Sequence, residues 1–403
     1  MKHKIIIGDC LESLAELPAA TFQTCITSPP YYGLRDYGVN GQIGLEDSLD
    51  EHLGALVDVF REVRRVLRPD ATLWLNYGDA YWSGAEKRDG GHQFVDGGKK
   101  KLLAAKGSLL CRRPRNPRFL KPKDMMGLPW RLAFALQADG WWLRSDIIWH
   151  KPNPMPSSVT DRPTSSHEYM FLLSPSQKYF YDADAVREKA SGTAHARGNG
   201  VSPKCSEPGQ GNKMNTSFSA SINELVDHRN LRDVWTIPIF GFSAAHFATF
   251  PPALLEPCIK AGTSEKGSCP ACGAPWRRIV EATGGTIGNG AWHDHDDDIG
   301  QGQRVEDGAF NDGTYKRTTK GWQPTCECPE APPVPCQVLD PFGGAGTTGL
   351  VADRLGRNST LLELNPEYAE LAARRIRDDA PLFTEVEVNP TQTRPKRTKD
   401  DQR

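Results

Sequence analysis

Apolar runs broken by prolines and glycines lie near both ends of the chain, and they predict its core strands. Near the start, residues 22–26 predict a short buried strand, which must end before Pro29 and Pro30 because proline cannot continue a central ladder. Near the end, Val338 and Leu339 follow a proline-rich stretch and predict the end of a second buried strand. We therefore expect the two ends of the chain to build one sheet.

A glycine-rich turn, a helix and a further strand are predicted after Leu339. The turn holds three glycines, which allow the backbone to bend tightly and to approach a ligand: Gly343, Gly344 and Gly346. Apolar positions from Leu350 to Leu355 predict an amphipathic helix that Gly356 can end. Residues 359–363 predict a strand that ends in Glu363, about twenty residues after the first glycine. That offset is expected of an acid that binds ribose hydroxyls in a Rossmann-like unit.

Two sequence strings resemble motifs of a single enzyme family. Residues 27–31 (TSPPY) resemble the catalytic loop of S-adenosylmethionine-dependent DNA amino-methyltransferases, and residues 340–348 (DPFGGAGTT) resemble their cofactor loop. Catalytic loop first and cofactor loop last is the order of the β class of that family. The resemblance implies methyl transfer from S-adenosylmethionine to an exocyclic amine in double-stranded DNA. It also implies an α/β Rossmann-like methyltransferase fold with a largely parallel sheet.

The residue types of the first string suit that chemistry. An exocyclic amine is a poor nucleophile because its lone pair is delocalised into the ring. A hydroxyl and a rigid carbonyl that accept the amine hydrogens would localise the lone pair for in-line attack on a methyl sulfonium. An aromatic ring can stack on the base once it has left the duplex. We therefore expect the catalytic loop to consist of Ser28, Pro29, Pro30 and Tyr31.

Further segments resemble the same family and suggest the cofactor contacts. They are residues 5–11, residues 32–38, a turn beside the target pocket at 149–154, and residues 245–251 over the methionine end. The resemblance implies that Asp9 touches the adenine of the cofactor, that Asp340 faces its methionine end and that Glu363 accepts from its ribose. The expected cofactor residues are Asp9, Cys10, Phe250, Asp340, Phe342, Gly343, Gly344, Gly346, Thr347, Thr348, Glu363 and Asn365.

The target base is suggested by Ser28. In the family that the chain resembles, cytosine-N4 enzymes mostly carry serine at this position and adenine-N6 enzymes mostly carry aspartate. Cytosine N4 is therefore favoured, and adenine N6 stays the alternative. The same serine, the motif order and the intact motifs argue against an RNA or protein-amide methyltransferase and against an inactive DNA-binding module. The position of Pro335-Cys336 directly before the cofactor strand argues against ring-carbon cytosine chemistry.

One histidine–glutamate pair needs no catalytic role in this scheme. His167-Glu168 could suggest acid–base chemistry. Amine methylation needs no strong general base, because the alkylated amine becomes acidic and can lose its proton to water. We therefore interpret the pair as structural.

Composition limits how the chain can bind DNA and where it works. The formal net charge of the 403 residues is −1, so affinity for DNA must come from local basic patches. No apolar run is long enough for a membrane span and no signal peptide opens the chain, so we expect a cytoplasmic, bacterial or phage-encoded protein. A restriction endonuclease as genetic partner, the recognition sequence and the oligomeric state stay open.

Basic and polar inserts interrupt the motifs. Ten Lys and Arg residues and no acid lie between Lys99 and Lys123, which suggests salt-dependent phosphate contacts. Residues 190–219 are rich in Gly, Ser, Asn and Lys, and the β class places target recognition in this part of the chain.

The motifs and inserts together divide the chain into expected ranges. They are a catalytic-loop half at 1–80, a basic mobile insert at 81–123, a continuation at 124–268 with target recognition at about 155–245, a zinc-binding insert at 269–336, a cofactor-binding half at 337–380 and a disordered tail at 381–403.

Four of the ten cysteines have the spacing of a metal site. A nucleotide fold without an export signal favours reduced thiols or metal over disulfides. Cys269 and Cys272 can share one tetrahedral ion, and the expected second half is Cys326 with Cys328. Cys336 could replace one of them, and His293 or His295 are weaker substitutes. The sequence thus predicts a structural zinc ion in a small ribbon-like insert.

Overall fold

The computed structural model describes residues 1–34, 38–39, 41–82, 120–189, 228–239, 250–283, 316–382 and 384–390. They belong to two compact units. The first contains residues 1–185, 232–276 and 324–403, and the second contains 186–231 and 277–323. None of the helices in the described part has the length and apolar character needed to cross a bilayer.

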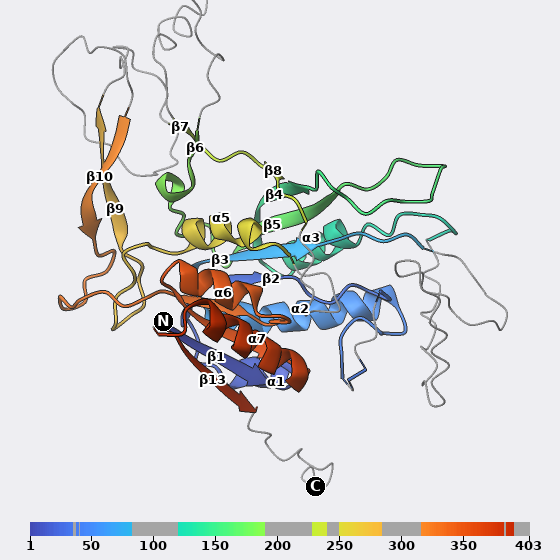
Figure 1. Ribbon diagram of the computed structural model, residues 1–403, viewed down its shortest axis with the longest axis horizontal. Coiled ribbons are helices and arrows are strands. Elements are labelled where there is room, and N and C mark those ends of the chain that lie inside the picture. The colour runs from blue at the N-terminus through green and yellow to red at the C-terminus, as the bar shows by residue number, and fades with distance from the viewer. Residues whose placement is uncertain are drawn as a thin grey trace, which may run out of the picture. The chain divides into compact units, whose positions relative to one another are not determined.

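The first unit is built on a nine-stranded sheet (Figure 1). In spatial order its strands are β13 (Glu385–Pro390), β1 (Lys2–Ile7), β12 (Asn358–Glu363), β11 (Gln337–Asp340), β2 (Phe22–Thr27), β3 (Leu67–Tyr77), β5 (His167–Ser174), β4 (Trp142–His150) and β8 (Val234–Thr236). All neighbouring pairs are parallel except β3 with β5 and β5 with β4. The predicted fold, an α/β domain with a largely parallel sheet, is confirmed.

Strands from the two ends of the chain alternate in the middle of this sheet. Val338 of β11 pairs with Thr24 of β2, and Ile5 of β1 pairs with Leu361 of β12. β11 thus lies between β2 and β12, and its carboxyl end comes beside that of β2. The cofactor loop and the catalytic loop follow these two strands, so the pairing brings the two motifs together.

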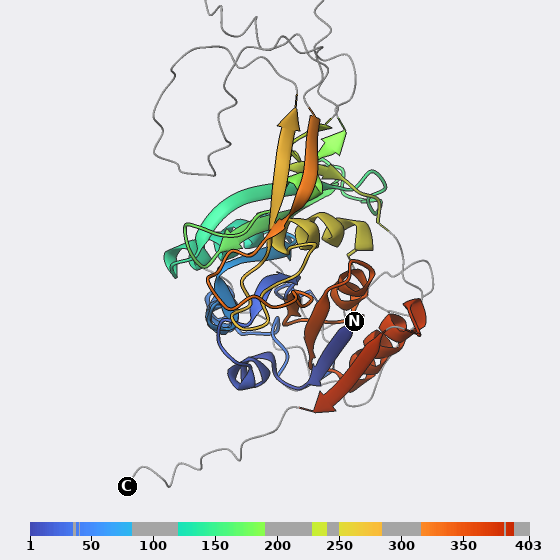
Figure 2. The same ribbon diagram turned by 90° about the vertical axis from the view of Figure 1, so that its left-hand side faces the viewer.

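Helices cover both faces of the sheet (Figure 2). Successive strand residues point to opposite faces. Ile6 and Leu362 belong to a buried cluster that also contains residues of α1 (Cys10–Glu16), α2 (Leu49–Val66) and α3 (Leu128–Ala138). Ile5 and Leu361 belong to a second cluster with residues of α6 (Thr347–Arg354) and α7 (Pro366–Asp379). α5 (Pro252–Gly262) contacts α6. Burial on both faces explains why the central strands read as nearly continuous apolar runs.

A buried polar group joins the strands of the two chain ends. His3 Nδ1 lies 2.7 Å from Ser359 Oγ, and His3 Nε2 lies 2.9 Å from Asp353 Oδ1. Thr384 Oγ1 donates to the same Asp353 oxygen at 2.9 Å. Burial lowers the pKa of His3 even though Asp353 opposes that shift. With His3 and Ser359 only 2% exposed, this serine–histidine–aspartate arrangement is structural.

The second unit is described in two short hairpins. β9 (Arg277–Thr283) pairs with β10 (Lys316–Gln323) in antiparallel register, with an irregularity between Thr319 and Gly321. β6 (Glu188–Lys189), which follows the 3-10 turn η1 (Ala183–Val186), pairs with β7 (His228–Arg229). The range predicted as a zinc insert therefore contains a β-hairpin between its two cysteine pairs.

The C-terminal boundary needs correction. A disordered tail was predicted from residue 381, but residues 385–390 form β13 and pair along β1 in parallel. The alternation of Val386 and Val388 with acidic residues carries this edge strand, and both valines pack on the sheet. Residues 391–403 lie outside the described residues.

Candidate active site

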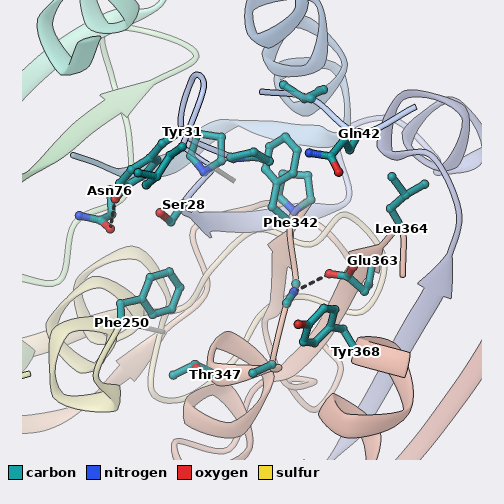
Figure 3. Close-up of a pocket in the computed structure, with 18 of the residues that line it drawn as sticks. Ser28, Tyr31, Gln42, Asn76, Phe250, Phe342, Thr347, Glu363, Leu364 and Tyr368 are labelled. Atoms are coloured by element: carbon teal, nitrogen blue, oxygen red, sulfur yellow. Dashed lines mark hydrogen bonds between the residues drawn. The ribbon is translucent and has the colours of Figure 1, made fainter. Parts of the chain in front are cut away.

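A cavity of about 700 Å³ opens at the carboxyl ends of the central strands. Its wall includes Gly8 after β1, Ser28 after β2, Pro341 after β11 and Leu364 after β12. Figure 3 shows Ser28, Tyr31 and Asn76 on one side and Glu363, Leu364 and Tyr368 on the other. Ligands of open α/β sheets bind at this edge, and the volume suits a nucleotide-sized molecule.

Glu363 holds the glycine loop at one side of the cavity. Its Oε2 accepts from Gly344 N and its Oε1 accepts from Asn365 N, both at 2.8 Å. Gly343 N donates to Leu362 O at 2.8 Å. Burial raises the pKa of Glu363, and the backbone donors oppose that shift. Each carboxylate oxygen keeps a further lone pair, so Glu363 can also accept from ribose hydroxyls at this wall.

Asp340, expected to face the methionine end of the cofactor, is buried under the loop. It is 1% exposed and is not among the residues that line the cavity. Its Oδ1 accepts from Thr27 Oγ1 at 2.7 Å and from Phe342 N at 3.0 Å, and its Oδ2 accepts from Thr348 Oγ1 at 2.6 Å. Burial raises its pKa. Asp340 therefore ties the catalytic strand, the cofactor loop and α6 together from outside the cavity lining.

Gly346 and Thr348 also lie outside the cavity wall. Gly346 has φ 74°, and a Cβ built on it would lie 2.7 Å from the Ala372 Cβ. A side chain would thus separate the start of α6 from α7. Thr347 does line the cavity, and its Oγ1 accepts from Arg375 Nη1 at 2.9 Å.

The other expected cofactor residues all line the cavity: Asp9, Cys10, Phe250, Phe342, Gly343, Gly344 and Asn365. Asp9 Oδ1 caps α1 by accepting from Leu11 N at 2.8 Å and from Glu12 N at 3.1 Å. Burial raises the pKa of Cys10 to about 12, so its thiol stays protonated. Tyr368 also lines the cavity and was not predicted.

The catalytic loop lines the opposite side of the cavity with all four expected residues, Ser28 to Tyr31. The Tyr31 ring meets the Tyr77 ring edge-on, with centroids 4.9 Å apart. Its hydroxyl donates to Glu168 Oε2 at 3.2 Å. Burial, followed by the nearby Glu168 carboxylate, raises the pKa of Tyr31 well above its usual value.

Three polar residues line the cavity although the sequence did not predict them there. Glu168, expected to be structural, lies in the cavity wall with Asn76 and Lys151. Lys151 belongs to the turn expected beside the target pocket, but its contact with Glu168 was not predicted. A useful signal was available in Glu168, which is an acid at the start of an otherwise apolar strand.

A second buried network supports the catalytic loop from α2. His52 is fully buried, with Nδ1 2.8 Å from Glu46 Oε2 and Nε2 2.8 Å from Tyr77 Oη. Both Glu46 oxygens accept from Gly44 N. Tyr77 is the ring against which Tyr31 packs, so this network connects α2 to the catalytic loop.

The four predicted cysteines meet in a group that could hold a metal ion. The sulfurs of Cys269, Cys272, Cys326 and Cys328 all lie within 4.8 Å of one another. Backbone N–H groups of Cys272 and Ala271 lower the pKa of Cys269 to about 7. Four sulfurs in two close pairs suit tetrahedral zinc. Cys336 is not in the group: it is buried, and its sulfur donates to Ser264 O at 3.7 Å.

Several expected DNA contacts lie outside the described residues. These are residues 83–119 of the basic insert and residues 190–227 and 240–245 of the recognition region. Residues 246–249 of the segment expected over the methionine end, and the weaker zinc candidates His293 and His295, also lie outside the described residues.

Comparison with known proteins gives the family. The sequence model of a DNA methylase family, the N6/N4 methyltransferases, matches residues 22–269 and 337–374. The chain belongs to this N6/N4 DNA methylase family.

Relatives with known roles cover nearly the whole chain. The chain is 38% identical to the Type II methyltransferase M.SmaI of Serratia marcescens over 93% of its own length and 90% of that protein. It is 38% identical to the Type II methyltransferase M.Cfr9I of Citrobacter freundii, over 92% of its own length and 87% of that protein. Among solved structures, the cytosine-N4-specific PvuII DNA methyltransferase has a similar fold, with a TM-score of 0.50 at 16% identity and 96% of each chain covered.

Proposed function

We propose that this N6/N4 DNA methylase transfers a methyl group from S-adenosylmethionine to N4 of cytosine at a specific site in DNA. The observation that carries the proposal is the position of Ser28, in the same cavity as the glycine loop that Glu363 holds. Serine at this position favours cytosine in the family that the sequence resembles. The Type II methyltransferases among its relatives support site-specific action on DNA and a role in restriction-modification.

The cofactor would occupy the side of the cavity lined by Asp9, the glycine loop and Glu363. Glu363 would accept from the ribose hydroxyls of the cofactor. Gly344 has no side chain, so the cofactor can lie close to the backbone of the loop. When bound, S-adenosylmethionine supplies an electrophilic methyl group on sulfur.

The residues on the opposite side would prepare the base. Ser28 Oγ and the Pro29 carbonyl would accept the two amine hydrogens and so direct the nitrogen lone pair toward the cofactor side. The Tyr31 ring would stack on the base, which has to leave the duplex to enter the cavity. No general base is required at the amine itself, because the alkylated nitrogen becomes acidic.

Product analysis tests the base. Unmethylated DNA would be incubated with the purified chain and isotopically labelled S-adenosylmethionine, hydrolysed to nucleosides and separated by chromatography. We expect label in N4-methylcytosine. Label only in N6-methyladenine would replace the proposal by the adenine alternative. Methylation-aware sequencing of DNA from cells that express the chain gives the recognition site.

The four-cysteine group is proposed to hold a structural zinc ion. Four thiolates leave no open position for water, so such an ion contributes folding energy rather than chemistry.

A further inference from the structure

The hydroxyl of Tyr31 ends in a polar cluster for which the proposed methyl transfer gives no role. The cluster consists of Glu168, Asn76 and Lys151. Tyr31 Oη lies 3.2 Å from Glu168 Oε2 and 3.5 Å from Asn76 Oδ1. The shorter contact is to a carboxylate, and hydrogen bonds to ionised acceptors are about twice as strong as neutral ones. Glu168 is therefore the main acceptor of the phenol hydrogen.

The other contacts of Glu168 fix its carboxylate. Lys151 Nζ donates to its Oε1 in an ion pair that is about four-fifths buried on both sides. Asn76 Nδ2 donates to Oε2 at 3.3 Å and also to Tyr169 O at 3.0 Å. Both carboxylate oxygens thus act as acceptors, and neither can be replaced by a donor without the loss of a contact.

The cluster is built on neighbouring strands of the core sheet. Glu168 on β5 is directly opposite Trp149 on β4, and Tyr169 is opposite Tyr77 on β3. Lys151 N donates to Ser166 O at 2.7 Å, which holds the end of β4 against the start of β5. Functional groups held by strands keep their geometry better than groups held by loops.

The aromatic ring of Tyr31 is also held by close contacts. A Cβ added at Gly78 would lie 2.8 Å from Tyr31 Cε2, so the ring packs directly on the backbone after β3. Tyr77 contacts it edge-on. The backbone of Gly78 and the ring of Tyr77 limit the ring from the side, and Glu168 holds its far end.

We propose that Glu168 is a positioning residue that fixes the ring of Tyr31 for stacking on the target base. Its carboxylate accepts the phenol hydrogen, and the ion pair with Lys151 holds the carboxylate in place. The phenol hydrogen is then committed to Glu168, the Ser28 hydroxyl also contacts the phenol oxygen, and the base meets the ring. This inference rests on the proposed methyl transfer at the Ser28 side of the cavity, and it holds for cytosine and for adenine.

The two contacts of the carboxylate make Glu168→Gln an informative change. Glutamine has nearly the same shape but only one acceptor oxygen, so its amide nitrogen must face either Lys151 or the phenol. Tyr31→Phe keeps the aromatic ring but removes the phenol oxygen, and with it the contacts to Glu168 and to the Ser28 hydroxyl. If Glu168 acts through the phenol, both changes break the same Tyr31–Glu168 interaction, and their effects do not multiply.

The experiment is a double-mutant cycle on single-turnover methyl transfer to DNA. Each single variant should lower the rate constant about tenfold or more, as expected when a hydrogen bond to a charged group is lost. The double variant should be at most about twofold slower than the slower of the two single variants. Melting temperature and S-adenosylmethionine affinity should stay close to those of the unchanged protein. Glu62→Gln is the matched control, since Glu62 pairs with Arg65 on α2 at 2.7 Å and does not line the cavity.

Two outcomes would overturn the inference. One is a Glu168→Gln variant that transfers methyl groups at the full rate. The other is a double variant whose defect equals the product of the two single defects. A wild-type product of N6-methyladenine alone would instead refute the base assignment and leave the cycle interpretable.

Discussion

Two acids at the cofactor loop differ in their surroundings: Glu363 lines the cavity, and Asp340 lies in the core. Glu363 and Asp340 both end strands, and both were expected to contact the cofactor, Asp340 at its methionine end and Glu363 at its ribose. Only the structure distinguishes the two acids: the buried Asp340 carboxylate accepts hydrogen bonds from Thr27, Phe342 and Thr348. Such a difference depends on tertiary contacts and leaves no trace in residue spacing.

Glu363→Ala should weaken S-adenosylmethionine binding about ten- to a hundredfold, as expected for loss of a charged acceptor of about 1.5–3 kcal/mol. Isothermal titration calorimetry measures the change. Unchanged affinity would place the cofactor elsewhere.

Asp340→Ala should act on the fold instead. It leaves Thr27 and Thr348 without their buried acceptor, so we expect the free energy of unfolding to fall by about 2 kcal/mol or more. Urea denaturation of the two variants side by side provides the comparison. An Asp340→Ala protein with full stability and poor cofactor affinity would restore the role that the sequence suggested.

Ser28→Ala and Tyr31→Ala should lower the rate of methyl transfer far more than they lower cofactor affinity. Their proposed contacts are with the base, and a hydrogen bond that strengthens as the amine turns tetrahedral acts on the transition state. Turnover and calorimetric affinity are measured on the same preparations. Full turnover by Ser28→Ala would contradict the lone-pair argument.

At the scale of elements, the cysteine group and the catalytic sheet are directly connected. Gln23 of β2 donates through Nε2 to Gly273 O at 2.9 Å and accepts through Oε1 from Gln337 N at 2.6 Å. Arg68 at the start of β3 donates to Cys272 O. Cysteine spacing predicted the group itself, but these contacts involve residues 204 or more positions apart, which a single sequence cannot pair.

Purified protein should contain about one zinc ion per chain by elemental analysis. Chelation should raise the protease sensitivity of the segment from Cys269 to Cys336, while the cofactor loop, held by Asp340 and Glu363, stays formed. Cys326→Ser should reproduce the effect of chelation, and Cys336→Ser, which changes a cysteine outside the group, is the matched control. Zinc near zero in protein that still methylates DNA would rule the ion out.

At the scale of the whole molecule, apolar runs in the sequence predicted the central strands β2, β11 and β12. Such runs are visible in the sequence because these strands are buried on both faces of the sheet. β13, where a tail was predicted, is an edge strand of alternating valines and acids near a charged end, and a short polar pattern of this kind resembles a tail. The hairpin β9–β10 was not predicted either, because the residues between its strands are rich in Gly and Asp and resemble a long loop.

The buried His3 gives a prediction for the stability of the whole fold. Its pKa is lowered in the folded protein, so the unfolded chain binds this proton more readily. The contribution of His3 is therefore fully present above its unfolded pKa of about 6.5 and is lost as the pH falls below that value. Urea denaturation between pH 8 and pH 5 measures it, and His3→Asn is the reference. The stability advantage of the unchanged protein over this variant should shrink toward low pH; an advantage that stays constant would show that His3 does not titrate on unfolding.

The alternation of strands from the two chain ends also sets the order of events on the ribosome. β2, which leads into the catalytic loop, borders β11, and 314 residues separate the paired Thr24 and Val338. At synthesis rates of about 5–20 residues per second, the earlier strand waits roughly 15 to 65 seconds for its neighbour. Until then no cavity exists in which a base and a methyl donor could meet. A nascent or prematurely terminated chain is therefore expected to be inert toward DNA, and activity should appear only after synthesis has passed residue 363.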